Sequence, residues 1–170
     1  MIPSTIVVLG APGAGKSTVG RLLASSLGLS FTDVDARIEA EQGKPIREIF
    51  ADSGEAHFRE LEREATLACL AEGGVISLGG GAVMTPAIRE AVSGLDVVWL
   101  QVSIAQATRR IGMNQARPLL LGNLRAQLIQ LLAERTPVYA ELATIVVDSD
   151  HNTPRQIVDH IVSHVWGAHT

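Results

Sequence analysis

Short apolar runs alternate with longer amphipathic stretches along the whole chain. Five of the short runs are rich in β-branched residues and predict strands at residues 5–9, 30–34, 75–78, 96–102 and 144–147. Between them, apolar residues recur three and four positions apart, which indicates helices. We expect these helices at residues 15–27, 36–41, 46–50, 56–71, 104–111, 124–133 and 155–166. Strands that alternate with helices predict right-handed βαβ units and a parallel sheet.

Turn residues mark where the expected helices begin and end. Gly28 should end the first helix, and Pro86 should begin a helix at its first or second position. Residues 52–55 should interrupt the helical pattern, and Pro137 should kink or stop a late helix. In the helix at residues 56–71, the expected buried stripe consists of Phe58, Leu61, Ala65 and Ala68.

The stretch with the clearest chemistry is Gly-Ala-Pro-Gly-Ala-Gly-Lys-Ser-Thr at residues 10–18, directly after the first strand. Its spacing is that of a P-loop, in which glycines let backbone N–H groups face phosphate oxygens at a helix N-terminus. Lys16 can bridge the outer phosphates, and the Ser17 hydroxyl can bind magnesium. A glycine-rich turn that contains Lys-Ser by chance is the alternative. The motif predicts a nucleoside triphosphate with magnesium and leaves the phosphoryl acceptor open.

Two aspartates stand at the end of the second expected strand, in Asp33-Val34-Asp35. Carboxyl ends of parallel strands face the ligand, and strand alternation would place both carboxylates on one side. One could hold magnesium through water while the other binds an acceptor hydroxyl. Alternatively, the pair caps the helix that follows, with Asp35 directly before it. Both interpretations can hold for one residue.

Three further stretches have a functional and an ordinary interpretation. Arg59 and Glu62 are three residues apart and can pair, although such charged runs often form a solvated face. Three glycines at 79–81 indicate close approach of a ligand to the backbone, or simple turn flexibility. The irregular segment at residues 112–123 is long enough to be a lid, and Arg117 is its only charge. We leave open whether Arg117 reaches a phosphate.

Composition narrows the class of protein. A chain of 170 residues with 46% hydrophobic residues suits one globular domain, and a net charge of −4 argues against a nucleic-acid surface. We expect no membrane span and no signal peptide. The single cysteine, Cys69, fits the cytoplasm and a buried helical position. Trp99 should be a core residue, and His160 and His164 should lie on a solvated helix face because no third metal ligand accompanies them.

Taken together, these motifs resemble the shikimate kinase family over nearly the whole chain, from residue 5 to about residue 165. The motifs that carry the resemblance are the P-loop, Asp33-Val34-Asp35, Phe58-Arg59 with Glu62, Leu78-Gly79-Gly80-Gly81-Ala82, Arg117-Pro118-Leu119-Leu120 and Arg135-x-Pro137-x-Tyr139. A P-loop alone is shared by many families, whereas all of these motifs in this order are jointly specific.

The resemblance implies an α/β fold with three layers, in which a five-stranded parallel sheet has the order 2-3-1-4-5. It implies one domain over residues 1–170, with a substrate-binding region at about 34–61 and a lid at about 112–123. The implied reaction is Mg²⁺-dependent transfer of the ATP γ-phosphoryl group to the 3-hydroxyl of shikimate, on the route to chorismate. One Mg²⁺ per subunit, a cytoplasmic location and a monomer are further expectations.

The resemblance also assigns residues to roles. Catalysis falls to Lys16, Asp35 and Arg117. ATP binding falls to Gly13, Ala14, Gly15, Lys16, Ser17, Thr18, Arg110, Arg117 and Pro154, with Arg110 stacked over adenine. Shikimate binding falls to Asp35, Arg59, Glu62, Gly79, Gly80, Gly81 and Arg135, where Arg59 and Arg135 clamp the carboxylate. Metal binding falls to Ser17 and Asp33.

Other classes of protein share parts of this pattern. A gluconate kinase shares the P-loop and an early aspartate, but the triple glycine and the Arg135–Tyr139 motif speak against it. A nucleotide kinase usually has Gly-Lys-Gly-Thr in its P-loop, and a GTPase needs an Asn-Lys-x-Asp motif that this chain lacks. An ATP-binding protein without turnover is the non-enzymatic alternative, and it would bind ATP without acceptor-dependent release of ADP.

Overall fold

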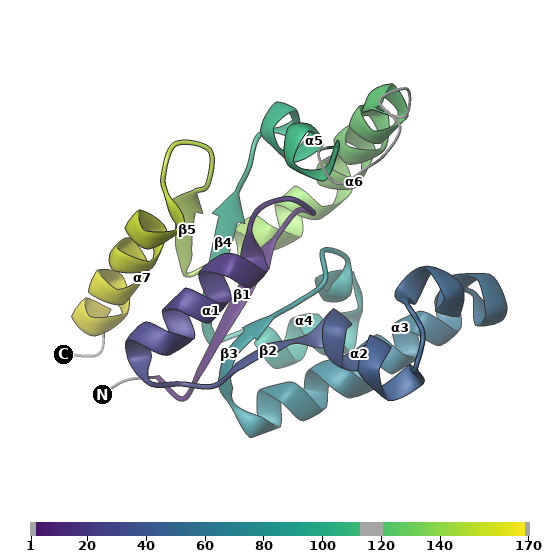
Figure 1. Cartoon of the computed structure of the whole chain (residues 1–170). Helices are drawn as coiled ribbons and strands as arrows, with labels where there is room; N and C mark the ends of the chain where they lie inside the picture. The colour runs from purple at the N-terminus through teal and green to yellow at the C-terminus, as the bar shows by residue number, and fades with distance from the viewer. Residues whose placement is uncertain (1–2, 113–120, 169–170) are drawn as a thin grey trace.

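The strands form one parallel sheet that lies between two layers of helices (Figure 1). The computed structural model describes residues 3–112 and 121–168. Its strands are β1 (Thr5–Gly10), β2 (Phe31–Asp33), β3 (Gly74–Ser77), β4 (Asp96–Gln101) and β5 (Ile145–Asp148), in the order β2-β3-β1-β4-β5. The predicted α/β class and strand order are therefore confirmed. Every neighbouring pair is parallel, with Val7 opposite Ile76 on one side of β1 and opposite Val97 on the other.

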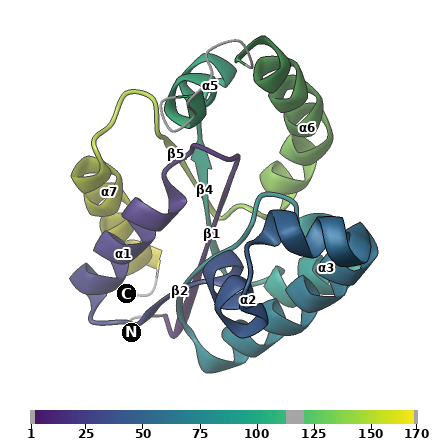
Figure 2. The same ribbon diagram turned by 45° about the vertical axis from the view of Figure 1, so that its right-hand side comes forward.

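Helices connect successive strands and cover both faces of the sheet (Figure 2). In chain order they are α1 (Lys16–Leu27), α2 (Val34–Gln42), α3 (Ile46–Glu72), the short 3-10 helix η1 (Ala82–Met84), α4 (Pro86–Val92), α5 (Ile104–Gly112), α6 (Leu121–Leu142) and α7 (Pro154–Ala168). Gly28 ends α1 and Pro86 begins α4, both as predicted. Of the described helices, none has a hydrophobic stretch sufficient to cross a membrane.

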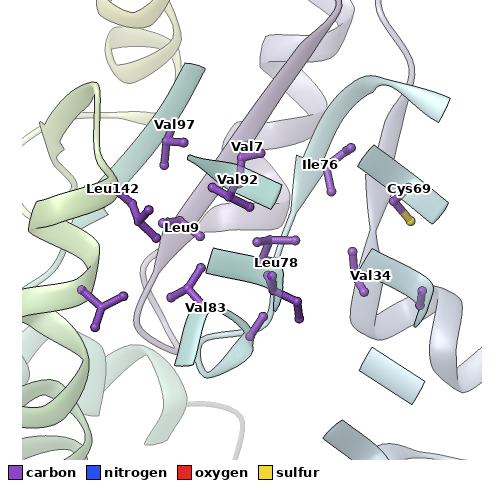
Figure 3. Close-up of a cluster of buried hydrophobic side chains, with 14 of the residues drawn as sticks. Val7, Leu9, Val34, Cys69, Ile76, Leu78, Val83, Val92, Val97 and Leu142 are labelled. Atoms are coloured by element: carbon purple, nitrogen blue, oxygen red, sulfur yellow. The ribbon is translucent and has the colours of Figure 1, made fainter. Parts of the chain in front are cut away.

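Alternation along β1 divides the core into two clusters. Val7 and Leu9 pack with residues of α2, α3, α4 and α6 on one face (Figure 3). Ile6 and Val8 pack with residues of α1 and α7 on the other face. A central parallel strand is buried on both sides, which is why its sequence is a continuous apolar run. Trp99 and Cys69 both belong to the first cluster as predicted, with Trp99 only partly buried.

The break predicted at residues 52–55 is present within α3. Gly54 has φ 83° and ψ 169°, so the helical path is interrupted there and then resumes. The predicted stripe after the break is partly wrong, because Ala68 is exposed. The helix instead buries Phe58, Glu62, Ala65, Thr66 and Cys69. A charged residue occupies the inner face because Glu62 pairs with Arg59, a contact that an apolar stripe does not reveal.

Pro137 does not stop the last long helix, which continues to Leu142. The proline removes one helical hydrogen bond, but Val138, Tyr139 and Leu142 are buried in the first core cluster and hold the final turns in place. The same helix begins at Leu121, earlier than predicted. Residues 113–120, which include most of the expected lid, lie outside the described residues.

Candidate active site

Three predicted motifs meet at the carboxyl edge of the sheet. The P-loop follows β1, the aspartate pair is at the end of β2, and the triple glycine follows β3. These three strands are neighbours in the order β2-β3-β1, so their carboxyl ends lie side by side. The fold therefore brings the candidate phosphate-binding loop and the two stretches that are candidates for binding the phosphoryl acceptor to one edge of the sheet.

The P-loop has the backbone conformation that its glycines permit. Gly13 has φ 83° and Gly15 has φ 90°, both in the left-handed region that favours glycine. A Cβ on Gly13 would also lie 3.1 Å from the carbonyl oxygen of Ala107 in α5. Gly15 directly precedes α1, whose free N–H groups and dipole suit an anion.

Lys16 is the first residue of α1, and its side chain folds back over the loop. Its Nζ atom donates to the carbonyl oxygens of Gly10 at 2.8 Å and Ala11 at 3.1 Å. Burial lowers the pKa of Lys16 to about 8, with Arg135 adding to this shift and the carboxylates of Asp35 and Asp33 opposing it. Lys16 remains mostly protonated at neutral pH, so it can serve as a positive charge for phosphate oxygens.

Asp33 links the end of β2 to the P-loop. Its Oδ2 accepts a hydrogen bond from the Ser17 hydroxyl at 2.8 Å, and its Oδ1 accepts one from the backbone N–H of Ala36 at 3.1 Å. Asp33 thus caps α2 and also contacts the predicted magnesium ligand Ser17. The capping alternative had Asp35 directly before the helix, whereas the structure has the cap at Asp33, because β2 ends there.

Asp35 lies in the first turn of α2 and not in a strand, so the alternation argument for it was wrong. The helix nevertheless turns its carboxylate toward the triple glycine, because a Cβ on Gly79 would lie 2.8 Å from Oδ1 and 2.9 Å from Oδ2. Its Oδ1 is buried and has no hydrogen-bond partner among the described residues. Burial first, then Glu62, Asp33 and Glu39, raise the pKa of Asp35 to about 6, against the lowering effect of Lys16.

Two guanidinium groups from different helices converge on the triple glycine. A Cβ on Gly81 would lie 2.9 Å from Nη2 of Arg135 and 2.9 Å from Nη2 of Arg59. Glu62 is 1% exposed, and its Oε1 accepts a hydrogen bond from Nη1 of Arg59 at 2.8 Å. Burial raises the pKa of Glu62 although Arg59 opposes the shift. Arg59 is therefore held by a buried carboxylate, and the solvated-face interpretation does not apply to it.

Arg110 is hydrogen-bonded to the outer side of the P-loop. Its Nη1 donates to the carbonyl oxygen of Gly13 and to the hydroxyl of Ser149, both at 3.0 Å, and its Nη2 donates to the carbonyl oxygen of Ser149 at 2.9 Å. A cavity of about 280 Å³ beside these groups is lined by Ala14, Gly15, Thr18, Arg110, Asn152 and Pro154, among others. Arg110 and Pro154 thus border one cavity next to the phosphate loop.

Sequence reasoning assigned no role to two residues that the structure connects to the site, although Tyr139 belongs to one of the motifs. Ser149 is 3% exposed, and its hydroxyl donates to the carbonyl oxygen of Ala14 at 2.7 Å. Tyr139 is completely buried, and its hydroxyl donates to the carbonyl oxygen of Gly80. The available signals were weak: Ser149 directly follows a strand at the ligand edge, and Tyr139 lies one helical turn after Arg135. Arg117, the predicted lid residue, lies outside the described residues.

A second cavity, of about 330 Å³, lies at the ends of β4 and β5 and is also lined by α6 residues. Ala11 and Trp99 are among its lining residues, which include none of the predicted site residues. The carboxylates at its border already have partners: Asp148 pairs with His151, and Asp150 accepts from the backbone N–H of Ser103 at 3.0 Å. The larger cavity thus borders the P-loop at Ala11 but is lined by none of the side chains to which the motifs assign chemistry.

The described residues contain no group of three or more histidine, cysteine, aspartate or glutamate side chains that could hold a metal ion. The closest fit for a hard cation is the oxygen pair of Ser17 and Asp33 beside the P-loop. Magnesium in kinase sites typically takes one or two protein oxygens and completes its shell with phosphates and water. The oxygen pair is compatible with that mode of binding.

Comparisons with known proteins agree with this geometry. The shikimate kinase family model matches residues 12–166. Shikimate kinase of Mycobacterium avium is 52% identical over 159 residues, which cover 92% of this chain and 90% of that protein. A structure of shikimate kinase from Acinetobacter baumannii in complex with shikimate superposes with a TM-score of 0.90 at 32% identity, covering 99% of this chain and 95% of the other.

A gluconokinase from Sinorhizobium meliloti shares only the fold, with a TM-score of 0.63 at 22% identity over 98% of this chain and 94% of the other. The family match, by contrast, extends over residues 12–166, a range that contains most of the P-loop, the aspartate pair, the triple glycine, Arg59 and Arg135. On these grounds, the chain belongs to the shikimate kinase family.

Proposed function

We propose that this protein transfers the γ-phosphoryl group of ATP to the 3-hydroxyl of shikimate, giving shikimate 3-phosphate and ADP. The observation that carries the proposal is the convergence of the guanidinium groups of Arg59 and Arg135 on Gly81, at the sheet edge that also holds the P-loop. Two planar forks around one point suit a carboxylate, because each can donate two parallel hydrogen bonds. The named relatives of this chain are shikimate kinases.

The acceptor is oriented by its two ends. Its carboxylate lies between Arg59 and Arg135, and its reacting hydroxyl lies at Asp35, which faces Gly79 two residues away from the clamp. Gly79, Gly80 and Gly81 have no side chains, so a flat ring can approach their backbone closely. Glu62 keeps Arg59 in place through the hydrogen bond at 2.8 Å. This arrangement fixes the distance between the bound carboxylate and the hydroxyl that reacts.

Asp35 accepts a hydrogen bond from the acceptor hydroxyl. As the bond between the acceptor oxygen and the γ-phosphorus forms, the bond from that phosphorus to the bridging oxygen of ADP breaks, and the hydroxyl proton passes to Asp35. A pKa of about 6 leaves Asp35 mostly ionised above neutral pH, so it is in the form that accepts the proton. Positioning and charge stabilisation carry most of the catalysis in phosphoryl transfer.

The ATP phosphates bind at the P-loop, where the N-terminus of α1 offers its free N–H groups. Lys16 exchanges the carbonyl oxygens of Gly10 and Ala11 for phosphate oxygens. Ser17 and Asp33 hold one Mg²⁺, which neutralises phosphate charge when bound. Arg110 and Pro154 flank the base in the cavity that they border. Arg117, which is predicted to contact the transferring group from the lid, lies outside the described residues.

The decisive experiment measures ADP release from Mg-ATP with shikimate, gluconate, AMP or no acceptor. We expect release with shikimate alone. Gluconate is the informative comparison because a gluconokinase shares this fold. Release with gluconate or AMP in place of shikimate would keep a P-loop kinase and reject the carboxylate clamp. Binding of ATP without acceptor-dependent release would move the protein to the non-enzymatic class. The cytoplasmic location and the monomeric state stay predictions.

A further inference from the structure

Tyr139 joins α6 to the triple glycine from inside the core. Its side chain is completely buried, its ring centroid lies 5.9 Å from that of Trp99, and its hydroxyl donates to the carbonyl oxygen of Gly80. Burial raises the pKa of Tyr139, so its hydroxyl keeps the proton that it donates. A buried phenol usually finds one partner for its polar end, and here that partner is the backbone of the acceptor site.

The hydrogen bond fixes the orientation of one peptide unit. The carbonyl of Gly80 and the N–H of Gly81 belong to the same planar peptide, which is trans like the other described peptides. In a trans peptide these two groups point in opposite directions. Holding the carbonyl toward Tyr139 therefore turns the Gly81 N–H away from it. Gly81 is also the residue on which the guanidinium groups of Arg59 and Arg135 converge.

The same hydrogen bond sets the position of Arg135. Arg135 and Tyr139 are four residues apart on α6, so they lie on one helix face. A Cβ on Gly80 would lie 2.8 Å from Nη1 of Arg135 and 3.5 Å from the Tyr139 hydroxyl oxygen. Pro137 lies between the two and removes one backbone hydrogen bond from this turn. The turn that carries Arg135 is thus held less by its own helix and more by the contact at Gly80.

We propose that Tyr139 is a positioning residue for the acceptor, whose hydroxyl holds the Gly79–Gly81 segment and Arg135 in the arrangement that binds the acceptor carboxylate. The inference rests on the proposed function, and it adds a determinant of acceptor affinity that does not itself touch the substrate. Its consequence is selective: the loss of the hydroxyl weakens binding of shikimate and leaves the ATP side, on the P-loop, unaffected.

The direct test compares Tyr139→Phe with Trp99→Phe. The first removes only the hydroxyl, and the second alters the packing of the same aromatic pair while it keeps the hydroxyl. We expect Tyr139→Phe to raise the KM and the calorimetric Kd for shikimate by about fivefold to tenfold, as for one lost hydrogen bond, with the KM for ATP unchanged. Trp99→Phe should change neither KM. A Tyr139→Phe protein with a lower Tm but unchanged affinity for shikimate would overturn the proposal.

A spectroscopic experiment on the unmutated chain covers the case in which Tyr139→Phe does not fold. The chain has one tyrosine, so incorporation of 3-fluorotyrosine labels Tyr139 alone. Its ¹⁹F resonance should shift when shikimate is added and should not shift with ADP alone. The absence of a shift at saturating shikimate would refute the coupling. A wild-type protein that releases no ADP with shikimate would instead reject the proposed function, so the two failures are distinguishable.

Discussion

Asp35 has an environment that differs from that of an exposed carboxylate. Burial and three acidic neighbours, Glu62, Asp33 and Glu39, raise its pKa to about 6, and only Lys16 opposes them. The sequence predicted that Asp35 would lie near the P-loop, but the prediction extended strand alternation past residue 34 to reach it. The boundary between β2 and α2 depends on the cap at Asp33, and two aspartates two residues apart do not reveal which of them forms the cap.

Asp35→Asn should abolish phosphoryl transfer while ATP binding stays near normal. The amide keeps the shape of the side chain, but it cannot take the proton from the acceptor hydroxyl, so kcat should fall by about 100-fold or more. Steady-state kinetics and calorimetry with ADP measure the two effects separately. An equal loss of turnover and nucleotide binding would contradict the assigned role. Asp52→Asn is the matched control, because Asp52 is exposed and its ion pair among the described residues is with Lys44.

The pH profile gives an independent readout of the same role. If the carboxylate is the active form, kcat/KM of the wild type rises with pH through about 6, the pKa of Asp35. Residual activity of Asp35→Asn should lack this acidic limb. An acidic limb that persists in the variant would assign the titration to another group, and the neighbours Glu62, Asp33, Glu39 and Lys16 would be next to test.

At the scale of elements, the P-loop depends on contacts that the motif does not contain. The carbonyl oxygens of Gly13 and Ala14 have hydrogen-bond partners that come from outside the motif. These partners are Arg110 of α5 and Ser149 after β5, respectively. The motif was readable from residues 10–18 alone. Its supports could not be read from the sequence, because the contacts join positions 97 and 135 residues apart.

Ser149→Ala should weaken ATP binding and leave shikimate binding unchanged. The substitution removes the donor to the Ala14 carbonyl and one acceptor for Arg110, so the loop is held less firmly in its phosphate-binding form. We expect the KM and Kd for ATP to rise by about fivefold, as for one hydrogen bond. Ser163→Ala is the control, because this exposed hydroxyl bonds only within α7. Equal changes for both substrates would argue for a general loss of structure.

The clamp depends on two helices, and Arg135→Lys tests the α6 half. Lysine keeps the charge but loses the planar fork, so it cannot bind a carboxylate through two parallel hydrogen bonds. The Kd for shikimate should rise by about tenfold or more, with the Kd for ATP unchanged. Arg125→Lys makes the same exchange at an exposed position on the same helix and should have no effect. Unchanged affinity for shikimate in Arg135→Lys would remove Arg135 from the clamp.

For the whole molecule, periodicity was sufficient for the sheet and insufficient for the details of α3 and α6. Runs of β-branched residues separated by amphipathic stretches determine a parallel sheet with covered faces, and the family resemblance added the strand order. The buried stripe of α3 was misjudged at Ala68, because the helix turns Glu62 inward to hold Arg59. Pro137 was predicted to kink or stop this helix, and the stop does not occur because the core holds the helix beyond it. Both departures arise where tertiary contacts override a local rule.

The site also affects the stability of the whole chain. The folded pKa of Asp35, about 6, lies above its ordinary value of 3.8, so the folded state binds the proton more tightly than the unfolded chain does. The free energy of unfolding should therefore decrease as pH rises from about 4 to about 6 and stay lower above that. For Lys16 the folded pKa of about 8 lies below 10.5, so stability should increase as pH rises from about 8 to 10.5.

Asp35→Asn should therefore stabilise the ligand-free protein at about pH 7.5, although it abolishes turnover. Oδ1 of Asp35 has no hydrogen-bond partner among the described residues, so the substitution loses no hydrogen bond there. It also removes the free-energy cost of holding a buried negative charge among acidic neighbours. Thermal unfolding should show a Tm higher by roughly 2–4 °C, as for about 1 kcal/mol in a chain of this size. At about pH 4.5, Asp35 of the folded wild type is already protonated, so the gain in Tm from Asp35→Asn should be smaller. A lower Tm for Asp35→Asn near neutral pH would show that Lys16 stabilises the carboxylate by more than its burial costs.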